Sequence, residues 1–281
     1  MPTYPIKVVC LSDTHTQIPP MVPDGDLLIH AGDMCTIGDV AELQAQINWL
    51  KSLPHRYKIV ISGNHDAYLD ARSRRTLPTD KQDGKVDWGD IKYLQHDHVV
   101  LRFPKHGNRE MKVYGAPQIP IQSVGAGVEH AFRYDRGKDA WTNTVPSDVD
   151  ILVTHTPPKW HKDLHVGLGC EWLLREAWRV RPKLHVFGHI HADPGIETVL
   201  WDDCQRAYER ICMRSSTDKL AGLLNLLNWI DLAALILKCL RNLAWSRIWG
   251  GEIFGSGIMV NAALMSQETG KLARLPQTVV I

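Results

Sequence analysis

Five short polar clusters, each placed directly after an apolar run, carry side chains of the types that bind metal ions. The clusters are Asp13-Thr14-His15, Gly32-Asp33, Gly63-Asn64-His65-Asp66, His155 and Gly188-His189-Ile190-His191. Their imidazole, carboxylate and amide groups, without a thiolate among them, suit manganese, iron or zinc and argue against a structural zinc knot. Taken singly, each cluster could equally be a turn or a hydrogen-bonded structural residue.

Taken together, the clusters are better explained by metal binding than by structure alone. The seven side chains of ligand type are Asp13, His15, Asp33, Asn64, His155, His189 and His191. A purely structural role would leave these polar groups unpaired at a sheet edge, which is unfavourable unless something binds them. Seven ligands are too many for one ion but suit two if a carboxylate bridges them. The sequence therefore predicts two divalent metal ions, with manganese favoured and iron or zinc as alternatives.

The apolar runs before these clusters have the length and composition of buried strands. They are IKVVCLS, DLLIHAGD, YKIVISGNHD, DILVTHTPP and KLHVFGHIH. Continuous runs of this kind are typical of strands buried on both faces of an α/β sheet. Residues 40–53, between the second and third run, have apolar residues at helical spacing and are predicted to form a crossover helix. Because ligands gather at the carboxyl ends of strands in such folds, we expect the five clusters to meet there.

Several segments outside these runs are predicted to complete the fold. Residues 115–148 are rich in glycine, proline and aromatic residues, and we expect an ordered loop that borders the site. The predicted strands of a second sheet are residues 93–94, 99–103 and 111–114, and the predicted returning strands are residues 258–262 and 278–281.

Residues 220–245 form a long apolar pattern at helical spacing. Its polar residues fall within one side of the helical wheel, and the remaining arc is almost wholly Leu, Ile, Ala and Trp. A helix packed on the core is one interpretation, and a peripheral helix at a membrane interface or against a protein partner is another. A transmembrane span is disfavoured because Asp231 and Lys238 would lie near the bilayer centre.

The five clusters, in this order, resemble the motifs of the calcineurin-like metallophosphoesterase superfamily over residues 6–191. Further segments are similar to its metallophosphoesterase domain-containing (MPPED-type) branch: Tyr114-Gly115-Ala116-Pro117, Phe132-Arg133-Tyr134, VTHTPP, Gly169-Cys170 and RPKLHVFGHIH. The resemblance implies an α/β fold, a four-layer metallophosphoesterase sandwich of two mixed β-sheets flanked by helices. We expect a core of residues 5–198 that residues 256–281 complete. Residues 199–255 depart from the pattern of this branch, in which a short link is expected, and are predicted to form an extra C-terminal helical insertion.

The resemblance also implies a role for each site residue. The first ion would be bound by Asp13, His15 and His191, the second by Asn64, His155 and His189, and Asp33 would bridge the two. His65 matches the family's catalytic histidine, and Asp66 would orient its imidazole. Two cations about 3.5–4 Å apart lower the pKa of a shared water, so a bridging hydroxide can attack the phosphorus. Protonated His65 would then give its proton to the leaving oxygen.

The composition of the chain bears on the size of its substrate and on the cellular compartment. The formal net charge is +1, so no excess of positive charge attracts long nucleic acid, and a small phosphoester is favoured. The six cysteines form no CxxC pair, and the first apolar run is too short for a secretory signal. We therefore expect a cytoplasmic protein, with peripheral membrane association if the helix at 220–245 binds a bilayer.

The leading hypothesis is a phosphodiesterase that acts on small nucleotide-like or cyclic nucleotide substrates, a class favoured by the resemblance. The alternatives are a phosphomonoesterase, a nuclease, and a metal- and nucleotide-binding regulatory protein with vestigial activity. A membrane-associated interaction protein that keeps the metals for structure is a further alternative. The complete ligand set and the His65-Asp66 pair favour an enzyme.

Four other histidines lie outside the five clusters' predicted ligands. His161 and His165 either face the substrate, since their loop follows a metal-ligand candidate, or lie on the surface. His30 and His185 fall inside strand runs and are predicted to be hydrogen-bonded structural residues.

Overall fold

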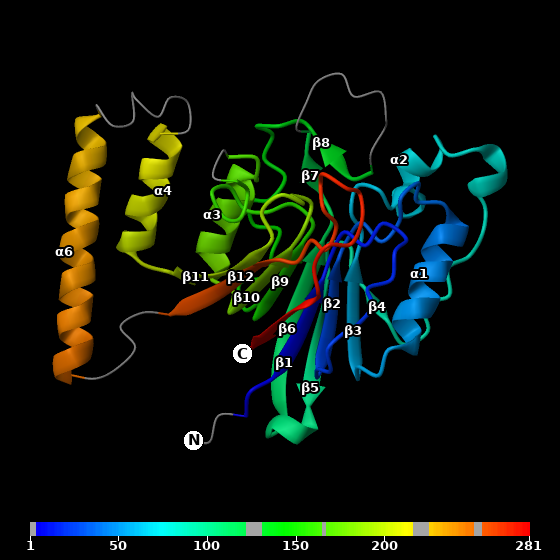
Figure 1. Ribbon diagram of the computed structural model, residues 1–281, viewed down its shortest axis with the longest axis horizontal. Helices are drawn as coiled ribbons and strands as arrows, with labels where there is room; N and C mark the ends of the chain where they lie inside the picture. Colours follow the sequence, from blue (N-terminus) through cyan, green and yellow to red (C-terminus); the bar gives the residue numbers. More distant parts are fainter. Residues whose placement is uncertain (1–3, 122–130, 165–166, 216–224, 250–254) are drawn as a thin grey trace.

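A computed structural model of the protein describes residues 4–121, 131–164, 167–215, 225–249 and 255–281. Two large mixed β-sheets lie at its centre, and helices lie outside them (Figure 1). The predicted fold class, an α/β sandwich of two mixed sheets flanked by helices, is confirmed.

The first sheet positions three of the polar clusters. Its strand order is β13 (Gln277–Val280), β1 (Lys7–Leu11), β2 (Leu27–Ala31), β3 (Tyr57–Ile61) and β4 (Lys92–Tyr93). β1 to β4 run parallel, whereas β13 pairs antiparallel with β1. The carboxyl ends of β1, β2 and β3 therefore lie at one edge of the sheet, and a polar cluster follows each of them.

The short strand predicted at residues 93–94 belongs to this first sheet, so its assignment to the second sheet is wrong. β4 pairs with β3, with Lys92 opposite Ile59, and the Leu94 N–H donates to the Val60 carbonyl at 2.9 Å. A two-residue strand carries too little apolar pattern to select a sheet, and its backbone pairing decides the outcome.

The second sheet positions the other two clusters. Its strand order is β11 (Gly195–Leu200), β12 (Ser256–Asn261), β10 (Leu184–Phe187), β9 (Ile151–Thr154), β6 (Arg109–Ala116) and β5 (Asp97–Phe103). β12, β10, β9 and β6 run parallel, and the two outer strands are antiparallel to their neighbours. The strands predicted at residues 99–103, 111–114 and 258–262 are confirmed in this sheet.

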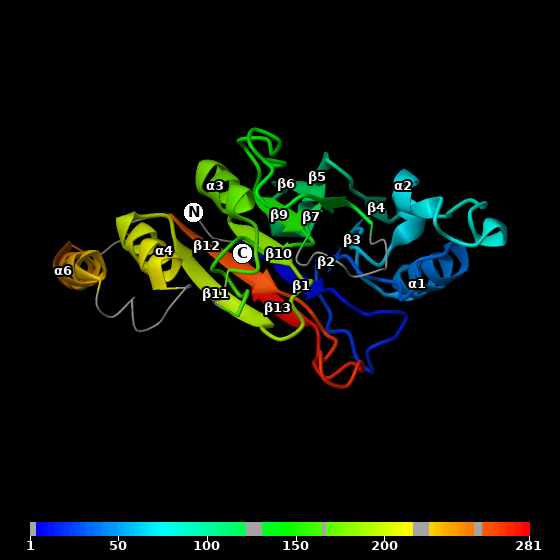
Figure 2. The same ribbon diagram turned by 90° about the horizontal axis from the view of Figure 1, so that it is seen from above.

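Apolar side chains join the layers. The largest cluster includes residues of both sheets, such as Val8, Ile29 and Val153, and fills the space between them. On the other face of the first sheet, α1 (Val40–Ser52) confirms the predicted crossover helix and packs on the sheet in a second cluster. On the far face of the second sheet, α3 (Glu171–Val180) packs in a third (Figure 2).

The remaining elements of the core are short. They are α2 (Ala71–Arg74), β7 (Ile119–Pro120), β8 (Arg133–Tyr134) and the 3₁₀ helices Ala67–Leu69, Thr79–Lys81 and Pro104–His106.

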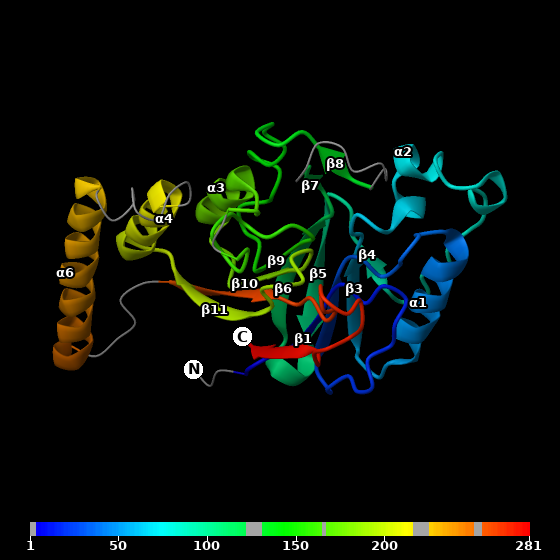
Figure 3. The same ribbon diagram turned by 45° about the horizontal axis from the view of Figure 1, so that its top comes forward.

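Two further helices, α4 (Asp203–Ser215) and α6 (Leu226–Trp249), pack side by side at one end of the molecule (Figure 3). In the chain they lie between β11 and β12, which pair as an antiparallel hairpin. α6 corresponds to the helix predicted at 220–245, but it begins at Leu226 and ends at Trp249, and residues 220–224 lie outside the described residues. The division of the chain at residues 198 and 255 stays a prediction.

α6 turns a polar side toward α4 and exposes apolar side chains. Asp231 forms ion pairs with Arg210 and Arg214 of α4, and Lys238 lies 3.3 Å from Asp203. The exposed apolar residues of α6 include Leu226, Leu227, Trp229, Ile230, Ile236, Leu237, Leu240 and Trp245. The interpretation of a helix packed on the core through its apolar arc is therefore wrong, because the charge pairs with α4 set its orientation. Its role at a membrane interface or against a partner stays a prediction.

The membrane-spanning interpretation, which the sequence disfavours, has no support in the structure. Among the helices of the described residues, none is both long enough and apolar enough to cross a bilayer.

Candidate metal centre

The five polar clusters lie just beyond the carboxyl ends of β1, β2, β3, β9 and β10. Four of the seven predicted ligands have left-handed backbone conformations: Asp13 (φ 55°), His15 (φ 42°), Asp33 (φ 54°) and His189 (φ 68°). This region is unfavourable for residues with a side chain, and residues held in it concentrate at functional sites. The unfavourable backbone conformations after these strands therefore indicate that this edge of the sheets is a functional site.

A first group of ligand atoms is formed by Asp13, His15, Asp33 and His191, whose atoms all lie within 4.8 Å of one another. His191 Nε2 is 2.9 Å from Asp13 Oδ1, and His15 Nε2 is 3.8 Å from Asp33 Oδ2. The two carboxylates are almost fully buried. Two imidazoles and two carboxylates in so small a space form a donor set that suits one divalent ion.

A second group consists of Asp33, His155 and His189, again with ligand atoms within 4.8 Å of one another. His155 Nε2 lies 3.2 Å from Asp33 Oδ2 and 3.1 Å from Asn64 Oδ1. The amide oxygen of Asn64 therefore lies next to this group and could serve as a fourth ligand atom. Asp33 belongs to both groups, which is the placement that a bridging carboxylate requires.

Backbone carbonyls orient two of the imidazoles. His15 Nδ1 lies 3.1 Å from the Cys35 carbonyl, and His155 Nδ1 lies 2.8 Å from the Ala31 carbonyl. A carbonyl can only accept, so each Nδ1 carries the proton in these contacts. Nε2 of each ring then faces the Asp33 carboxylate, and a second ring nitrogen bonded to a carbonyl is an arrangement common to metal-ligating histidines.

The two buried carboxylates are ionised. Burial alone would raise the pKa of Asp13, but its hydrogen bond to His191 and the charge of that ring hold the pKa below its ordinary value. Burial also opposes ionisation of Asp33, yet the charge and hydrogen bond of His155 hold its pKa well below the usual range. The site thus concentrates two negative charges away from water, which is unfavourable unless cations lie beside them.

His155 supplies part of that positive charge. Burial would lower the pKa of His155, but the Asp33 carboxylate raises it to about 9. Burial lowers the pKa of His189 to about 3, so its imidazole is neutral and ready to bind a metal. His155 would have to give up this proton to serve as a metal ligand, and the charge of the ion would then take the place of the proton's charge.

Two glycines make room for the carboxylates. A Cβ at Gly188 would lie 2.1 Å from Asp13 Oδ2, and a Cβ at Gly63 would lie 2.2 Å from Asp33 Oδ1. Any other residue would push a carboxylate out of its group. The backbone thus forms a cradle around both carboxylates, and the donor set, the charge and the cradle together fit two divalent ions.

The Asp66 carboxylate joins two loops of the site. It is fully buried and accepts hydrogen bonds from the backbone N–H groups of Gly63 at 2.8 Å and Cys35 at 3.0 Å. Asp66 therefore holds the loops after β2 and β3 together. The Thr36 carbonyl lies 3.0 Å from Nδ1 of the His65 ring and helps to orient it. The role of Asp66 in orienting the same ring stays a prediction.

His65 lies beside the first group. Its N–H donates to Asp33 Oδ1 at 2.8 Å, and the centroid of its ring lies 4.7 Å from that of His15 in an edge-to-face contact. The residue is only partly buried. His65 thus borders the metal groups without belonging to either, as a proton donor to a substrate would.

Three residues that support the site were missed by sequence reasoning. The Thr36 carbonyl orients His65, and a carbonyl leaves no signal in a sequence. Asn261 Nδ2 donates to the carbonyls of Ile190 and Asp193, each at 2.9 Å, and so fixes the loop that carries His191. Arg274 Nη1 donates to the His191 carbonyl at 3.0 Å. A buried asparagine at the end of an apolar strand is the one signal that could have indicated such a role.

The predicted loop at 115–148 reaches the site: the Ala131 N–H donates to the Asn64 carbonyl at 2.9 Å. Residues 122–130 of this loop lie outside the described residues.

His30 and His185 are structural, as predicted. His30 Nε2 lies 3.1 Å from Thr14 Oγ1, and His185 Nε2 lies 2.8 Å from Thr154 Oγ1. Burial lowers the pKa of His30 to about 4 and that of His185 to about 3, so both rings are neutral.

His161 lies neither on the surface nor in the groups of metal ligands. It is 1% exposed, with Nδ1 2.6 Å from Glu197 Oε1 on β11 and Nε2 3.2 Å from Glu209 Oε1 on α4. Both interpretations made from the sequence are wrong for this residue, because the carboxylates that bury it come from elements far along the chain. His165 lies outside the described residues.

The unfolding free energy is expected to fall by about 3 kcal/mol between pH 6.5 and 9 through His161 alone. Burial disfavours the imidazolium, but Glu197 and Glu209 outweigh it and raise the pKa of His161 to about 9. The folded chain therefore holds this proton after the unfolded chain has released it, so stability is fully present below about pH 6.5 and is lost toward pH 9.

Urea unfolding at pH 6.5, 7.5 and 9 measures this slope. His161→Gln should be less stable at pH 6.5 and should lose most of the slope. Equal slopes in the two proteins would contradict the assignment of the buried charge to His161.

The stretch that carries all five polar clusters matches a known family. A model of the calcineurin-like phosphoesterase family matches residues 6–193. The chain therefore belongs to the calcineurin-like phosphoesterase family. The predicted family is thus confirmed.

Three known proteins are similar to this chain in sequence. It is 36% identical over 207 residues to human "Metallophosphoesterase domain-containing protein 1", in a match that covers 68% of this chain and 62% of that protein. It is 34% identical over 207 residues to "UPF0046 protein C25E10.12" of Caenorhabditis elegans, covering 69% of this chain and 71% of that one. It is 45% identical over 208 residues to "Probable rhamnogalacturonate lyase C" of Emericella nidulans, covering 73% of this chain.

The lyase match covers 19% of that relative, so the chain spans about a fifth of it and less than two thirds of the human protein. Among solved structures, that of TT1561 of Thermus thermophilus is similar at a TM-score of 0.44 and 15% identity, covering 70% of this chain and 85% of that one.

Proposed function

We propose that this protein is a metal-dependent phosphoester hydrolase that uses two divalent metal ions. The observation that carries the proposal is the shared position of Asp33, whose carboxylate belongs to both groups of ligand atoms. Membership of the calcineurin-like phosphoesterase family supports the same reaction class.

The seven proposed ligands are divided between the two ions. Asp13, His15 and His191 hold the first ion, Asn64, His155 and His189 hold the second, and Asp33 bridges them. Manganese is the proposed metal, with iron or zinc as alternatives, because the donors are imidazole, carboxylate and amide groups. When bound, the two ions offset the negative charge of the phosphoryl group and lower the pKa of a water molecule.

His65 is the proposed general acid. Its Nδ1 donates to the Thr36 carbonyl, so Nε2 is the atom that exchanges a proton with the leaving oxygen. The contact between the His65 ring and the His15 ring, at the border of the first group, supports this role. In this scheme Asn64 and Asp33 are metal ligands, and His65 is the residue that takes part in proton transfer.

The proposed substrate is a small phosphodiester of nucleotide or cyclic nucleotide type. The formal net charge of +1 gives no attraction for long nucleic acid, and the resemblance to the MPPED-type branch favours the small diester. Phosphomonoesters are the control substrate class, because the same ligands could also bind a terminal phosphate.

Metal analysis of the purified protein, joined to a panel of phosphoesters with added manganese, tests the proposal. Hydrolysis of bis(p-nitrophenyl) phosphate and of cyclic nucleotides is expected, with about two metal ions per chain. EDTA should abolish the turnover, and added manganese should restore it. Two bound ions with no turnover of any mono-, di- or cyclic phosphoester would contradict an enzyme and favour a metal-binding regulatory protein.

A further inference from the structure

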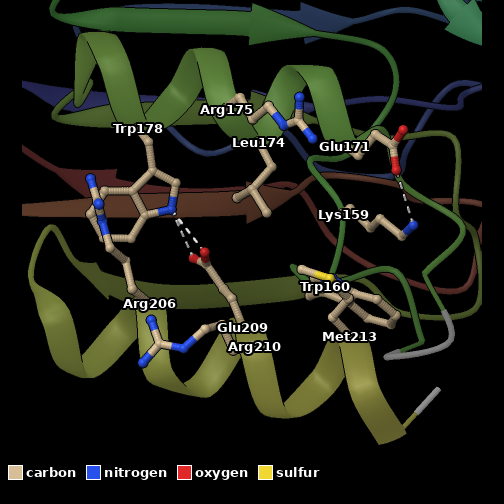
Figure 4. A pocket seen from close by; sticks show the side chains of 10 residues that line it. All are labelled: Lys159, Trp160, Glu171, Leu174, Arg175, Trp178, Arg206, Glu209, Arg210 and Met213. Carbon is tan, nitrogen blue, oxygen red and sulfur yellow. Dashed lines mark hydrogen bonds and ion pairs between the residues drawn. The ribbon is translucent and has the colours of Figure 1, made fainter. Parts of the chain in front are cut away.

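A pocket of about 430 Å³ lies between α3 and α4 (Figure 4). Its lining shares no residue with either group of predicted metal ligands. The volume falls in the range of pockets that hold small organic molecules, about 300–1,000 Å³. The pocket is therefore a second place on this chain where a small ligand fits.

Apolar side chains form the interior of this pocket. Leu174 extends from α3 toward α4, and Trp160 and Met213 lie across from it (Figure 4). Trp160 is 2% exposed and so is held firmly by its surroundings. An apolar surface between two helices is the usual place for the apolar part of a ligand.

Hydrogen-bonded pairs hold the two ends of the pocket. At one end the Trp178 indole N–H donates to Glu209 Oε2 at 2.8 Å. At the other end Lys159 Nζ donates to Glu171 Oε2 at 3.4 Å (Figure 4). Glu209 also pairs with the buried His161, so its negative charge is compensated. Both carboxylates of the lining are thus already engaged.

Two arginines of the lining stack on tryptophan rings. The Arg175 guanidinium lies 4.3 Å from the centre of the Trp172 ring, and that of Arg206 lies 4.5 Å from the Trp178 ring. Within the described part of the chain, neither forms an ion pair with a carboxylate, whereas Arg210 pairs with Asp231. A guanidinium stacked on an indole is held in place while the N–H groups at its edge remain able to bind an anion.

We propose that this pocket binds a small organic anion. The apolar body of the ligand lies against Leu174 and Trp160, and its carboxylate, sulfonate or phosphate is recognised by one of the two guanidinium groups, that of Arg175 or that of Arg206. Charge-assisted hydrogen bonds to a guanidinium are stronger than neutral ones, so a neutral molecule of the same shape binds more weakly. The anionic group of the ligand determines specificity, and contact with the apolar interior of the pocket buries the rest of the ligand.

The pocket joins two parts of the chain. Arg175 and Leu174 lie within the stretch that matches the family, residues 6–193, whereas Arg206 and Met213 lie beyond it. The anion site is therefore a property of this chain, with its α4, rather than of the matched stretch alone.

A fluorescent organic anion, 8-anilinonaphthalene-1-sulfonate, tests the proposal on the protein of residues 1–281. The double variant Arg175→Gln/Arg206→Gln should bind the probe at least tenfold more weakly, on the order of 1.4 kcal/mol. Its neutral analogue N-phenyl-1-naphthylamine should bind both proteins equally. Arg102→Gln, which removes an exposed arginine outside the pocket, is the matched control and should leave binding unchanged.

A second variant distinguishes loss of the site from loss of the fold. Leu174→Trp fills the interior and leaves both guanidinium groups in place, so it should abolish binding of both probes to the pocket. The circular dichroism spectrum and metal content should stay unchanged. Unchanged affinity for the sulfonate in both the filled and the double variant would place the probe elsewhere, such as on the exposed face of α6, and would overturn the proposal.

Discussion

Replacing Asp33 with asparagine should remove both metal ions from the protein. Two divalent ions bring four positive charges, and the seven proposed ligands include only two carboxylates, Asp13 and Asp33. Asparagine keeps the size of the side chain but halves this compensating charge, at a site where both carboxylates are almost fully buried. Since Asp33 belongs to both groups of ligand atoms, neither ion would keep its full donor set.

Elemental analysis of the purified variant measures the outcome, with about two ions per chain expected in the unaltered protein and about none in Asp33→Asn. Asp13→Asn is the informative comparison, because Asp13 belongs to the first group alone, so one ion should remain. Asp87→Asn, at an exposed carboxylate paired with Lys51, should change nothing. Two ions retained by Asp33→Asn would rule out the bridging role.

The strand ends could be predicted because the signals there are local. An apolar run followed by a polar turn identifies both the strand and the edge at which it ends, so Asp13, Asp33 and His155 were all predicted at one edge. Their convergence then follows from the topology, since parallel strands place their carboxyl ends together. The structure brings all seven predicted ligands to this edge.

What the sequence could not predict depends on contacts between distant segments. The assignment of β4 to the first sheet depends on pairing with β3. The orientation of α6 depends on Asp231 meeting two arginines of α4, although its apolar arc suggests burial. His161 is buried because Glu197 and Glu209 approach it from β11 and α4. When the carboxylate partner of a residue lies on a distant element, the sequence around that residue does not show the pairing.

Asp66 shows the same limit at the site itself. Its place next to His65 suggests a carboxylate–imidazole pair, whereas the backbone N–H groups of Gly63 and Cys35 occupy its oxygens. The Thr36 carbonyl lies 3.0 Å from His65 Nδ1, so the backbone contributes to the position of the proposed acid, and a carbonyl leaves no signal in the sequence.

Replacing His65 with asparagine should leave both metal ions in place and lower kcat by about 10²–10⁴-fold, the usual contribution of a general acid. The His65 side chain belongs to neither group of ligand atoms, so the metal content has no reason to change. The bond from the residue to Asp33 Oδ1 is made by its backbone N–H, which asparagine keeps. The variant therefore removes a proton donor and little else.

The leaving group decides between a role in proton transfer and a role in structure. An aryl phosphodiester with a p-nitrophenolate leaving group needs little protonation, whereas an alkyl or ribose oxygen needs a full proton. His65→Asn should therefore slow the alkyl ester more than the aryl ester, and His98→Asn, at an exposed histidine on β5, should slow neither. An equal loss for both esters would assign His65 to substrate binding, and full activity with both would remove it from the mechanism.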